Sequence, residues 1–199
     1  MNIHKYTAGS IVALFSLCYA TTAIAADIVV TVKNQHCIAM VDSTAYRCAI
    51  GKHGVTKDKV EGDGKTPIGE FPLRQLYVRM DKIVKNKLKY VSLPVQAIKP
   101  EDGWCDDPKN KDYNKLVNLH NFDHSISHET MYRTDDKYNI LLVVGYNDDP
   151  IVPGKGSAIF VHVATPEYSG TAGCVAFSEA DLLRILAKLN DKSKLIVNN

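Results

Sequence analysis

A histidine and a cysteine in one short stretch of the chain are the residues best suited to chemistry. His162 lies near the end of an apolar run, and Cys174 follows twelve positions later in a turn that contains Gly170 and Gly173. A cysteine thiolate is a strong nucleophile, and an imidazole within hydrogen-bond reach is its usual activator. The spacing is too long for one helical face and suits a strand followed by a returning loop. The pair predicts a cysteine nucleophile with a histidine as general base and acid.

Each of the two residues also has an ordinary structural interpretation. A histidine in a buried strand is often a core residue, and a lone cysteine often packs as a small apolar side chain. The glycines between them favour the catalytic interpretation, because they let the backbone turn tightly and approach a ligand closely. The backbone amides of Gly173 and Cys174 can then converge beside the sulfur, as an oxyanion hole for acyl transfer requires.

The elements that must position this pair are mostly strands. In a strand over residues 157–163, Ile159, Val161 and Val163 point to one face. Phe160 and His162 then point to the other face. Apolar and β-branched runs predict further strands at residues 27–32, 35–41, 45–50, 71–78, 138–146 and 194–197.

One helix is expected after the cysteine, over residues 179–189. Ser178 is a favourable N-cap, and Asp181 three residues later completes a capping box. The helix dipole contributes little to Cys174, because its effect fades within one turn. Apolar side chains recur at helical spacing and form one stripe that packs on the sheet, at Leu182, Ile185, Leu186 and Leu189.

Residues 1–25 match the pattern of a secretory signal peptide. Lys5 gives a basic start, residues 11–20 are apolar, and Ala23-Ile24-Ala25 is a small-x-small cleavage site. We therefore expect an exported mature chain over residues 26–199, located in the periplasm if the organism is Gram-negative. The apolar stretch is short for a membrane span, so we expect no stable membrane anchor after cleavage. An uncleaved anchor is the alternative.

The charges of the chain argue against a nucleic-acid partner. The formal net charge of +2 falls to +1 when Lys5 leaves with the signal peptide. Proteins that bind nucleic acids usually carry a basic stripe instead.

Two other motifs suggest a phosphate site and a metal site, and the sequence does not match either requirement. A phosphate-binding loop at residues 62–69 would need a glycine where Lys59 stands. His120, His124 and His128 would share one face only on a helix, and the polar residues around them do not favour a helix. We therefore expect no metal and no cofactor.

Four cysteines remain after removal of the signal peptide. In an exported protein such an even number suggests disulfides. A two-residue loop at residues 42–43 would place Cys37 and Cys48 opposite each other, which makes a bridge between them plausible. Cys105 then stays free or pairs elsewhere. A bond between Cys105 and Cys174 would block the nucleophile unless it serves as a redox switch.

Residues 99–137 form a long polar stretch between two expected strands. Loops of this length are usually functional or disordered. The segment contains Trp104, the only tryptophan of the chain, which could line a substrate groove or hold the loop against the body. We expect this loop to act as a lid over the active site.

These motifs together resemble the YkuD-type L,D-transpeptidase family of bacterial cell-wall enzymes. The family signature is a histidine, a variable loop and Ser/Thr-x-Gly-Cys, which here corresponds to His162 and Thr171–Cys174. A Thr-Pro-x-Gly-x-Phe turn of the family corresponds to Thr66–Phe71. Three further motifs resemble a proteobacterial branch, at residues 103–108, 145–150 and 173–176.

The resemblance implies a mainly β fold with some α structure, a YkuD-like mixed β-sandwich with one C-terminal helix packed beside it. It also implies that Cys174 attacks the carbonyl between the third and fourth residues of a peptidoglycan stem tetrapeptide. An amine of a second stem peptide then resolves the thioester into a 3→3 crosslink, whereas water gives L,D-carboxypeptidase activity. Substrate contacts are expected from Thr171, Tyr146, Asn147 and Trp104.

One position departs from the family pattern. Many members carry an arginine two residues after the cysteine, where this chain has Ala176. The usual substrate contacts of that cation are therefore missing, and the acceptor of the acyl group is left open. The alternative from a different class of protein is a non-catalytic wall-binding protein that retains the fold.

Overall fold

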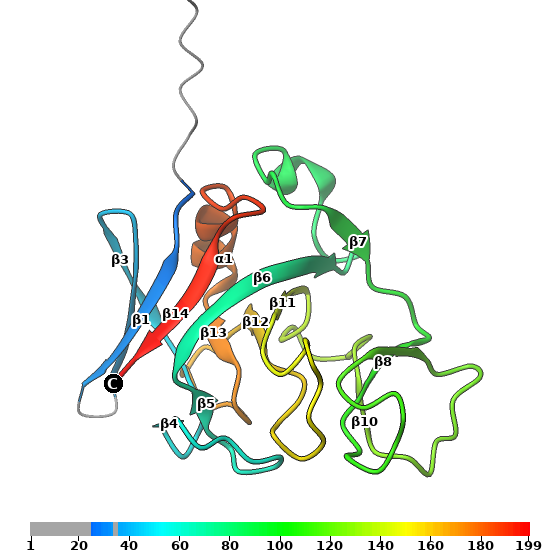
Figure 1. Cartoon of the computed structure of the whole chain (residues 1–199). Helices are drawn as coiled ribbons and strands as arrows, with labels where there is room; N and C mark the ends of the chain where they lie inside the picture. The colour runs from blue at the N-terminus through cyan, green and yellow to red at the C-terminus, as the bar shows by residue number, and fades with distance from the viewer. Residues whose placement is uncertain (1–24, 34–35) are drawn as a thin grey trace, which may run out of the picture.

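The structure, a computed structural model, describes residues 25–33 and 36–199. The expected signal peptide, residues 1–25, lies outside the described residues, apart from Ala25. The described part is mainly strand with one α-helix, as the sequence predicts (Figure 1). Within it, no helix combines the length and the apolar composition of a membrane span.

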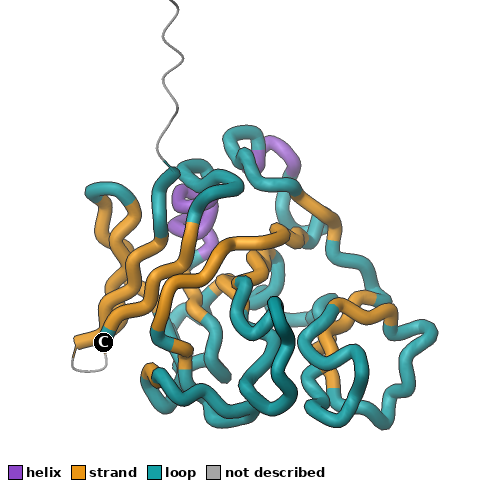
Figure 2. The backbone as a smooth tube through the Cα atoms, in the orientation of Figure 1, coloured by secondary structure: helices purple, strands orange, loops and turns teal. Residues whose placement is uncertain are grey.

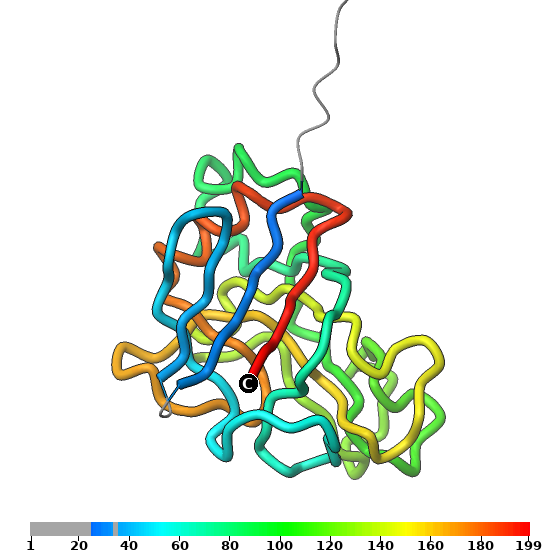
Figure 3. The backbone as a smooth tube through the Cα atoms, turned by 60° about the vertical axis from the view of Figure 1, so that its left-hand side comes forward, coloured from blue at the N-terminus to red at the C-terminus, as the bar shows by residue number. Residues whose placement is uncertain are grey.

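A large mixed sheet forms the body of the molecule. Its strands follow the order β13-β12-β11-β6-β14-β1-β2-β3, and β7 pairs with β6 beside this path. The terminal strands β1 and β14 run parallel to each other at its centre (Figure 3). The strands are β1 (Ile28–Lys33), β2 (His36–Val41), β3 (Thr44–Cys48), β6 (Gly69–Val78), β7 (Val95–Ala97), β11 (Ile140–Val144), β12 (Phe160–Val163), β13 (Val175–Phe177) and β14 (Lys194–Asn198).

Strand β6 joins the two halves of this sheet. Its first residues, Gly69–Pro72, pair with β14, and its later residues, Leu73–Val78, pair with β11. The two far edges of the sheet then meet, because Ala49 and Ala176 exchange two backbone hydrogen bonds of 2.8 Å. The sheet therefore closes on itself directly beside Cys174.

The two halves of the sheet share one apolar core. Ile28 and Val30 of β1 contribute from one half, and Ile140 and Leu142 of β11 contribute from the other. The curved sheet thus encloses its own core between two of its faces. The expected mainly β fold, with a mixed sheet and one packed helix, is observed.

A second, smaller apolar cluster lies on the other face of β11 and β12. It contains Phe160 and Cys174, whereas Ile159, Val161 and Val163 belong to the main core. The predicted alternation of residues 159–163 is thus confirmed. The regular strand starts only at Phe160, because Ala158 has a left-handed backbone (φ 51°) that interrupts the extended chain.

Helix α1 (Glu179–Leu186) packs its apolar stripe on the main core. The Ser178 hydroxyl accepts a hydrogen bond from the Asp181 amide at 3.1 Å, which confirms the N-cap. In the predicted capping box, the Asp181 carboxylate would accept from the Ser178 amide. It accepts from the Ser178 hydroxyl instead, at 2.8 Å, so this half of the capping box is wrong. The helix also ends before Leu189, which is buried in a tight turn that follows it.

Residues 99–137 are not a plain loop. They contain β8 (Asp102–Cys105), β9 (Leu116–Asn118) and β10 (His128–Thr130), which form a separate three-stranded sheet in the order β10-β8-β9. We call residues 99–137 the excursion. Its short strands are set in long turns beside the main sheet (Figure 2). The prediction of an irregular long loop is therefore wrong.

The remaining short elements connect these parts. A parallel pair, β4 (Val55–Thr56) and β5 (Thr66–Pro67), frames the glycine-rich turn, and η1 (Lys85–Leu88) follows β6. Cys37 and Cys48 lie opposite each other in the β2–β3 hairpin and form a disulfide with a Cα–Cα distance of 5.0 Å. The expected bridge is confirmed.

Candidate active site

Cys174 lies in a turn that is attached to the closed edge of the sheet. Before the cysteine, the Thr171 amide donates to the Ile50 carbonyl, and the Lys52 amide donates to the Thr171 carbonyl, both at 2.8 Å. After it, Ala176 pairs with Ala49. Both ends of the turn are therefore held by the chain that continues from β3.

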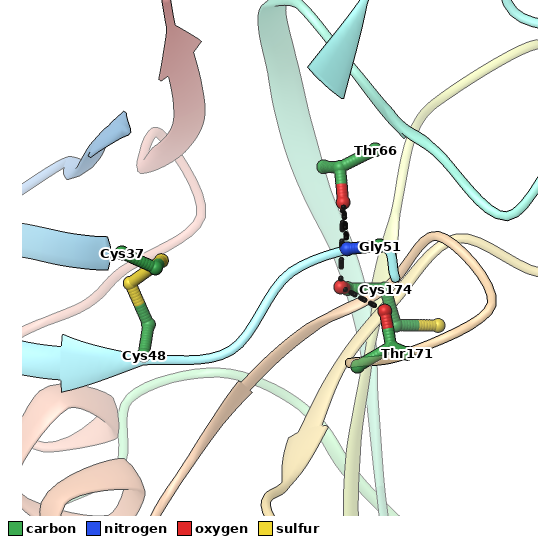
Figure 4. Close-up of a disulfide and its surroundings, with 6 residues drawn as sticks. All are labelled: Cys37, Cys48, Gly51, Thr66, Thr171 and Cys174. Atoms are coloured by element: carbon green, nitrogen blue, oxygen red, sulfur yellow. Dashed lines mark hydrogen bonds between the residues drawn. A yellow bond between two sulfur atoms is a disulfide. The ribbon is translucent and has the colours of Figure 1, made fainter. Parts of the chain in front are cut away.

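Two threonine hydroxyls, one in the turn and one in β5, bond to the Cys174 carbonyl (Figure 4). The Thr171 hydroxyl donates to this carbonyl at 2.7 Å, and the buried Thr66 hydroxyl donates to it at 3.5 Å. Thr66 accepts in turn from the Gly51 amide at 2.8 Å. The Cys174 sulfur points away from this polar network, so the threonines orient the backbone and leave the thiol free.

Gly173 supplies a conformation that a larger residue would strain. Its φ is +146°, and a Cβ atom built there would lie 2.9 Å from the Lys65 carbonyl oxygen. Its amide donates to the Thr171 hydroxyl at 3.1 Å. The Cys174 amide has no partner among the turn, loop and side-chain hydrogen bonds of the described residues. Of the two amides expected to form an oxyanion hole, that of Gly173 is bonded to Thr171 in the structure, and that of Cys174 is available.

The Cys174 sulfur is held by the segment that precedes and begins β12. Its thiol donates to the Ala158 carbonyl at 3.3 Å, and it accepts from the Phe160 amide at 3.4 Å. Burial raises the pKa of the thiol to about 12, although the Phe160 hydrogen bond lowers it. The side chain of Cys174 is therefore a protonated thiol at neutral pH.

His162 lies in the middle of β12, between Leu141 of β11 and Ala176 of β13. Its Nδ1 atom lies 2.9 Å from the Val163 carbonyl oxygen. Since a carbonyl only accepts, Nδ1 carries the proton and Nε2 keeps its lone pair. Burial lowers the pKa of His162 to about 4, although this hydrogen bond raises it. The imidazole is therefore a neutral base, and its ring packs 5.4 Å from the Tyr138 ring.

His162 and Cys174 line one cavity of about 350 Å³, together with Thr171 and Ala176. Two separate elements thus bring the predicted pair to the same space. Both residues are buried, with 6% of their surface exposed. In the structure the thiol donates to the Ala158 carbonyl, so a proton transfer to the imidazole requires the thiol to leave this carbonyl.

Charged side chains of both signs line the same cavity. The cations are Lys52, Lys59, Arg133 and Lys137, and the carboxylates are Glu61, Asp106 and Glu129. The position where the family pattern has arginine is occupied by Ala176, which is almost fully buried and carries no charge. The positive charge at this cavity comes from other elements instead.

The most buried of these cations is Lys59. Its side chain is 3% exposed, and its Nζ forms an ion pair with Asp63 at 2.6 Å. Glu129 faces the same cavity, and burial together with the neighbouring Asp106 charge raises its pKa. Lys59 and Glu129 were not predicted as site residues, because neither stands in a motif that contains the cysteine or the histidine.

Three of the expected substrate contacts lie outside the cavity lining. The Trp104 ring packs on Phe160 at 5.2 Å, and its indole N–H donates to Asn114 at 3.0 Å. The Tyr146 hydroxyl donates to the Lys155 carbonyl, and the Asn147 amide donates to the carbonyls of residues 152 and 156. Of the four expected contacts, only Thr171 lines the cavity.

The three histidines of the excursion do not share a helix. His128 lies in β10, and His120 lies in a turn ahead of it. Among residues 25–33 and 36–199, no group of three or more His, Cys, Asp or Glu side chains is arranged to hold a metal ion.

Comparison with known proteins places the chain in a family. The family model of the YkuD L,D-transpeptidase catalytic domain matches residues 25–197. An L,D-transpeptidase from Mycobacterium smegmatis is a similar solved structure, with 13% identity and a TM-score of 0.38 over 87% of this chain and 59% of that chain. The chain thus spans less than two thirds of the length of that neighbour. A comparison of this chain with curated proteins found no match. Because the family match covers nearly the whole chain, the chain belongs to the family of YkuD L,D-transpeptidase catalytic domains.

Proposed function

We propose that the protein is an exported cysteine acyl-transfer enzyme that acts on peptidoglycan stem peptides through a Cys174 thioester. The observation that carries this proposal is the cavity shared by the Cys174 thiol and the neutral His162 imidazole. Family membership supports the class of reaction and of substrate. We further propose that residues 26–199 form a single catalytic domain.

In the first half of the reaction, the Cys174 sulfur attacks the carbonyl carbon of an L-residue that precedes a D-residue. At rest the thiol is protonated and the imidazole is neutral. The thiol proton therefore passes to Nε2 of His162 as the C–S bond forms. The imidazolium then gives this proton to the departing amine as the C–N bond breaks. A thioester and a free amine result.

In the second half, an amine of another stem peptide attacks the thioester. His162 removes a proton from this amine and returns it to the sulfur, so a new amide and the free thiol form. If water enters in place of the amine, the product is a shortened stem peptide. Stem peptides carry carboxylate and ammonium groups, which suits a cavity lined by residues such as Arg133 and Glu129.

The Cys174 amide is the proposed donor to the oxyanion. It has no partner among the turn, loop and side-chain bonds of the described residues, whereas the Gly173 amide is bonded to Thr171. An oxyanion donor contributes on the order of 10²- to 10³-fold in rate in enzymes of this kind. Gly173 then acts through the shape that it gives to the turn.

The Cys37–Cys48 disulfide supports the proposed export. Disulfides persist mainly in oxidising compartments, such as the periplasm or the extracellular space. This observation is independent of the signal pattern in residues 1–25. The periplasm is the proposed location if the organism is Gram-negative.

The test is incubation of the mature chain with disaccharide-tetrapeptides, followed by mass spectrometry of products and of intact protein. Crosslinked dimers support transpeptidation, and tripeptides support the L,D-carboxypeptidase alternative. Fragmentation of a dimer identifies which L-residue supplied the acyl group. A covalent adduct on Cys174 is expected in either case.

The matched control is Cys105→Ala, which removes the other free buried cysteine. This variant should form the adduct and the products as the parent does. If neither dimers nor tripeptides form, the non-catalytic wall-binding alternative is preferred. If Cys174→Ala retains turnover, the proposed nucleophile is wrong.

A further inference from the structure

The backbone of residues 158–160 holds the nucleophile from one side. The Ala158 carbonyl accepts the Cys174 thiol proton at 3.3 Å, and the Phe160 amide donates to the sulfur at 3.4 Å. Ala158 has φ 51°, a conformation that non-glycine residues adopt rarely and only where the surroundings impose it. Something must therefore hold the Ala158 peptide in place.

Asn114 of the excursion makes the contact that holds this peptide. Its side-chain oxygen accepts from the Ala158 amide at 3.1 Å and from the Trp104 indole at 3.0 Å. Its side-chain nitrogen donates to the carbonyls of Tyr146 at 3.1 Å and Asn147 at 2.8 Å. A carboxamide has two donor hydrogens and two acceptor lone pairs, so all four positions of Asn114 are used. Its orientation is fixed.

The residues beside Asn114 and Ala158 strengthen the same connection. Tyr113 accepts from the Gly156 amide at 3.1 Å, and Ser157 donates to Glu61 at 2.6 Å. Three successive residues, 156 to 158, are thus each bound by a side chain from outside the segment. Asn114 itself is 6% exposed, so water cannot readily replace its hydrogen bonds.

We propose that Asn114 is a positioning residue for Cys174, acting through the Ala158 peptide. The excursion then sets the orientation of the nucleophile instead of closing over it as a lid. Asn114 bonds the amide of Ala158, so without its oxygen the left-handed φ of Ala158 (51°) can relax. The Ala158 carbonyl and the Phe160 amide then shift relative to the sulfur. The inference rests on the proposed function, in which Cys174 is the nucleophile.

A purely structural role for Asn114 makes a different prediction. Asn114 joins the excursion to the turn after β11 and to the start of β12, so its loss would lower stability in any case. A structural role changes the melting temperature and leaves the chemistry of the folded thiol unchanged. The decisive measurement is therefore the reactivity of Cys174 itself, which needs no substrate.

The variant is Asn114→Gly in a Cys105→Ser background, which leaves one free thiol among the described residues. Glycine suits the left-handed backbone at this position (φ 58°), so the change removes the side chain with little backbone strain. Iodoacetamide alkylation is followed by intact mass from pH 6 to 11, and turnover and melting temperature are measured in parallel. We expect the alkylation rate constant to fall about tenfold and its pH profile to move to higher pH, because the thiolate loses the Phe160 amide, a buried donor that favours the charged form.

The matched control is Asn139→Ala. Asn139 is also a buried asparagine with a side-chain hydrogen bond, to Asp136, and it does not line the cavity. This variant should lose stability and keep the alkylation profile of the parent. If Asn114→Gly keeps that profile while its melting temperature falls, the positioning role is refuted.

A second variant covers the case in which Asn114→Gly does not fold. Trp104→Phe keeps an aromatic ring against Phe160 but removes the indole N–H that orients the Asn114 oxygen. We expect an alkylation rate about threefold lower, and an unchanged profile would refute the inference. If Cys174 of the parent is neither alkylated nor acylated by substrate, the proposed function fails instead, which distinguishes the two outcomes.

Discussion

The two free cysteines of the described chain, Cys174 and Cys105, are both buried, yet their access to a cavity and the charges around them differ. Cys174 accepts a hydrogen bond from the Phe160 amide and lines a cavity together with His162. Cys105 lies in β8 with His128 opposite it on β10, outside that cavity. Each cysteine thus has a histidine near it, but only Cys174 and His162 share a cavity that could admit a substrate.

Burial raises the pKa of both thiols, so burial alone does not separate a nucleophile from a packing residue. The charges around the two thiols differ. A hydrogen bond from the Asp107 backbone lowers the pKa of Cys105, and the charges of Asp106, Asp107 and Asp112 raise it. Glu129 raises the pKa of Cys174, and Lys59 lowers it by a smaller amount. Both thiols thus have a backbone hydrogen bond, and Cys174 differs in the cavity that it lines and in its nearby cation.

The largest expected difference between the two cysteines is in turnover. Cys174→Ala should lose at least about 10⁴-fold in crosslinking or hydrolysis, because the covalent route is gone. Cys105→Ala should keep its activity and lose about 1 kcal/mol of unfolding free energy to the small cavity left behind. Product formation by mass spectrometry and urea unfolding measure the two effects. Equal losses of turnover in both variants would contradict the assignment of Cys174, and not Cys105, as the nucleophile.

The next effect concerns His162, which shares the cavity of Cys174 and is its proposed base. His162→Gln should lower kcat/KM about 10²- to 10⁴-fold, which is the usual contribution of a general base. In the parent enzyme, activity requires a neutral imidazole. Because burial lowers the pKa of His162 to about 4, the acidic limb of the kcat/KM profile should lie near pH 4. An acidic limb near pH 6.5 would mean that the ring is solvated in the working enzyme.

The same buried imidazole makes stability depend on pH. In the unfolded chain a histidine has a pKa near 6.5, so between pH 6.5 and about 4 the unfolded state binds more protons. Stability present above pH 6.5 is therefore lost as pH falls towards 4. The difference of pKa corresponds to about 3 kcal/mol.

Urea unfolding of the parent and of His162→Gln at pH 7 and pH 4.5 tests this dependence. The variant should lose less stability than the parent over this interval. The raised pKa of Glu129 acts in the opposite direction, but Glu129 is present in both proteins and its effect cancels in the difference. Identical pH dependence in the two proteins would contradict a buried, neutral His162.

Local patterns in the sequence predicted much of this fold. Alternation along residues 159–163 assigned the two faces of β12, and the opposed cysteines of a hairpin predicted the Cys37–Cys48 bridge. The N-cap at Ser178 was equally visible. Each of these features depends on neighbours within a few positions or on one tight turn, which a single sequence displays directly.

Features that depend on distant parts of the chain had no such signal. The closure of the sheet joins Ala49 to Ala176, and alanine carries no pattern that predicts a pairing partner. The strands of the excursion have three or four residues each, too few to show alternation. Lys59 reaches the cavity from the glycine-rich turn, and only the folded chain brings it near Cys174.

The smallest expected effect tests the cation that distinguishes Cys174 from Cys105. Lys59→Met keeps the apolar stem and removes the charge, so the pKa of Cys174 should rise and its alkylation at pH 9 should slow about threefold. The ion pair with Asp63 already offsets part of the Lys59 charge, which keeps the effect small. Lys59→Arg should restore the rate, and the Lys59→Met, Asp63→Asn double variant separates loss of charge from an unpaired carboxylate. Alkylation of Cys105 should not respond, since it lies among aspartates. If Lys59→Met slows both thiols equally, a general loosening of the fold explains the result, and the cation does not tune the nucleophile.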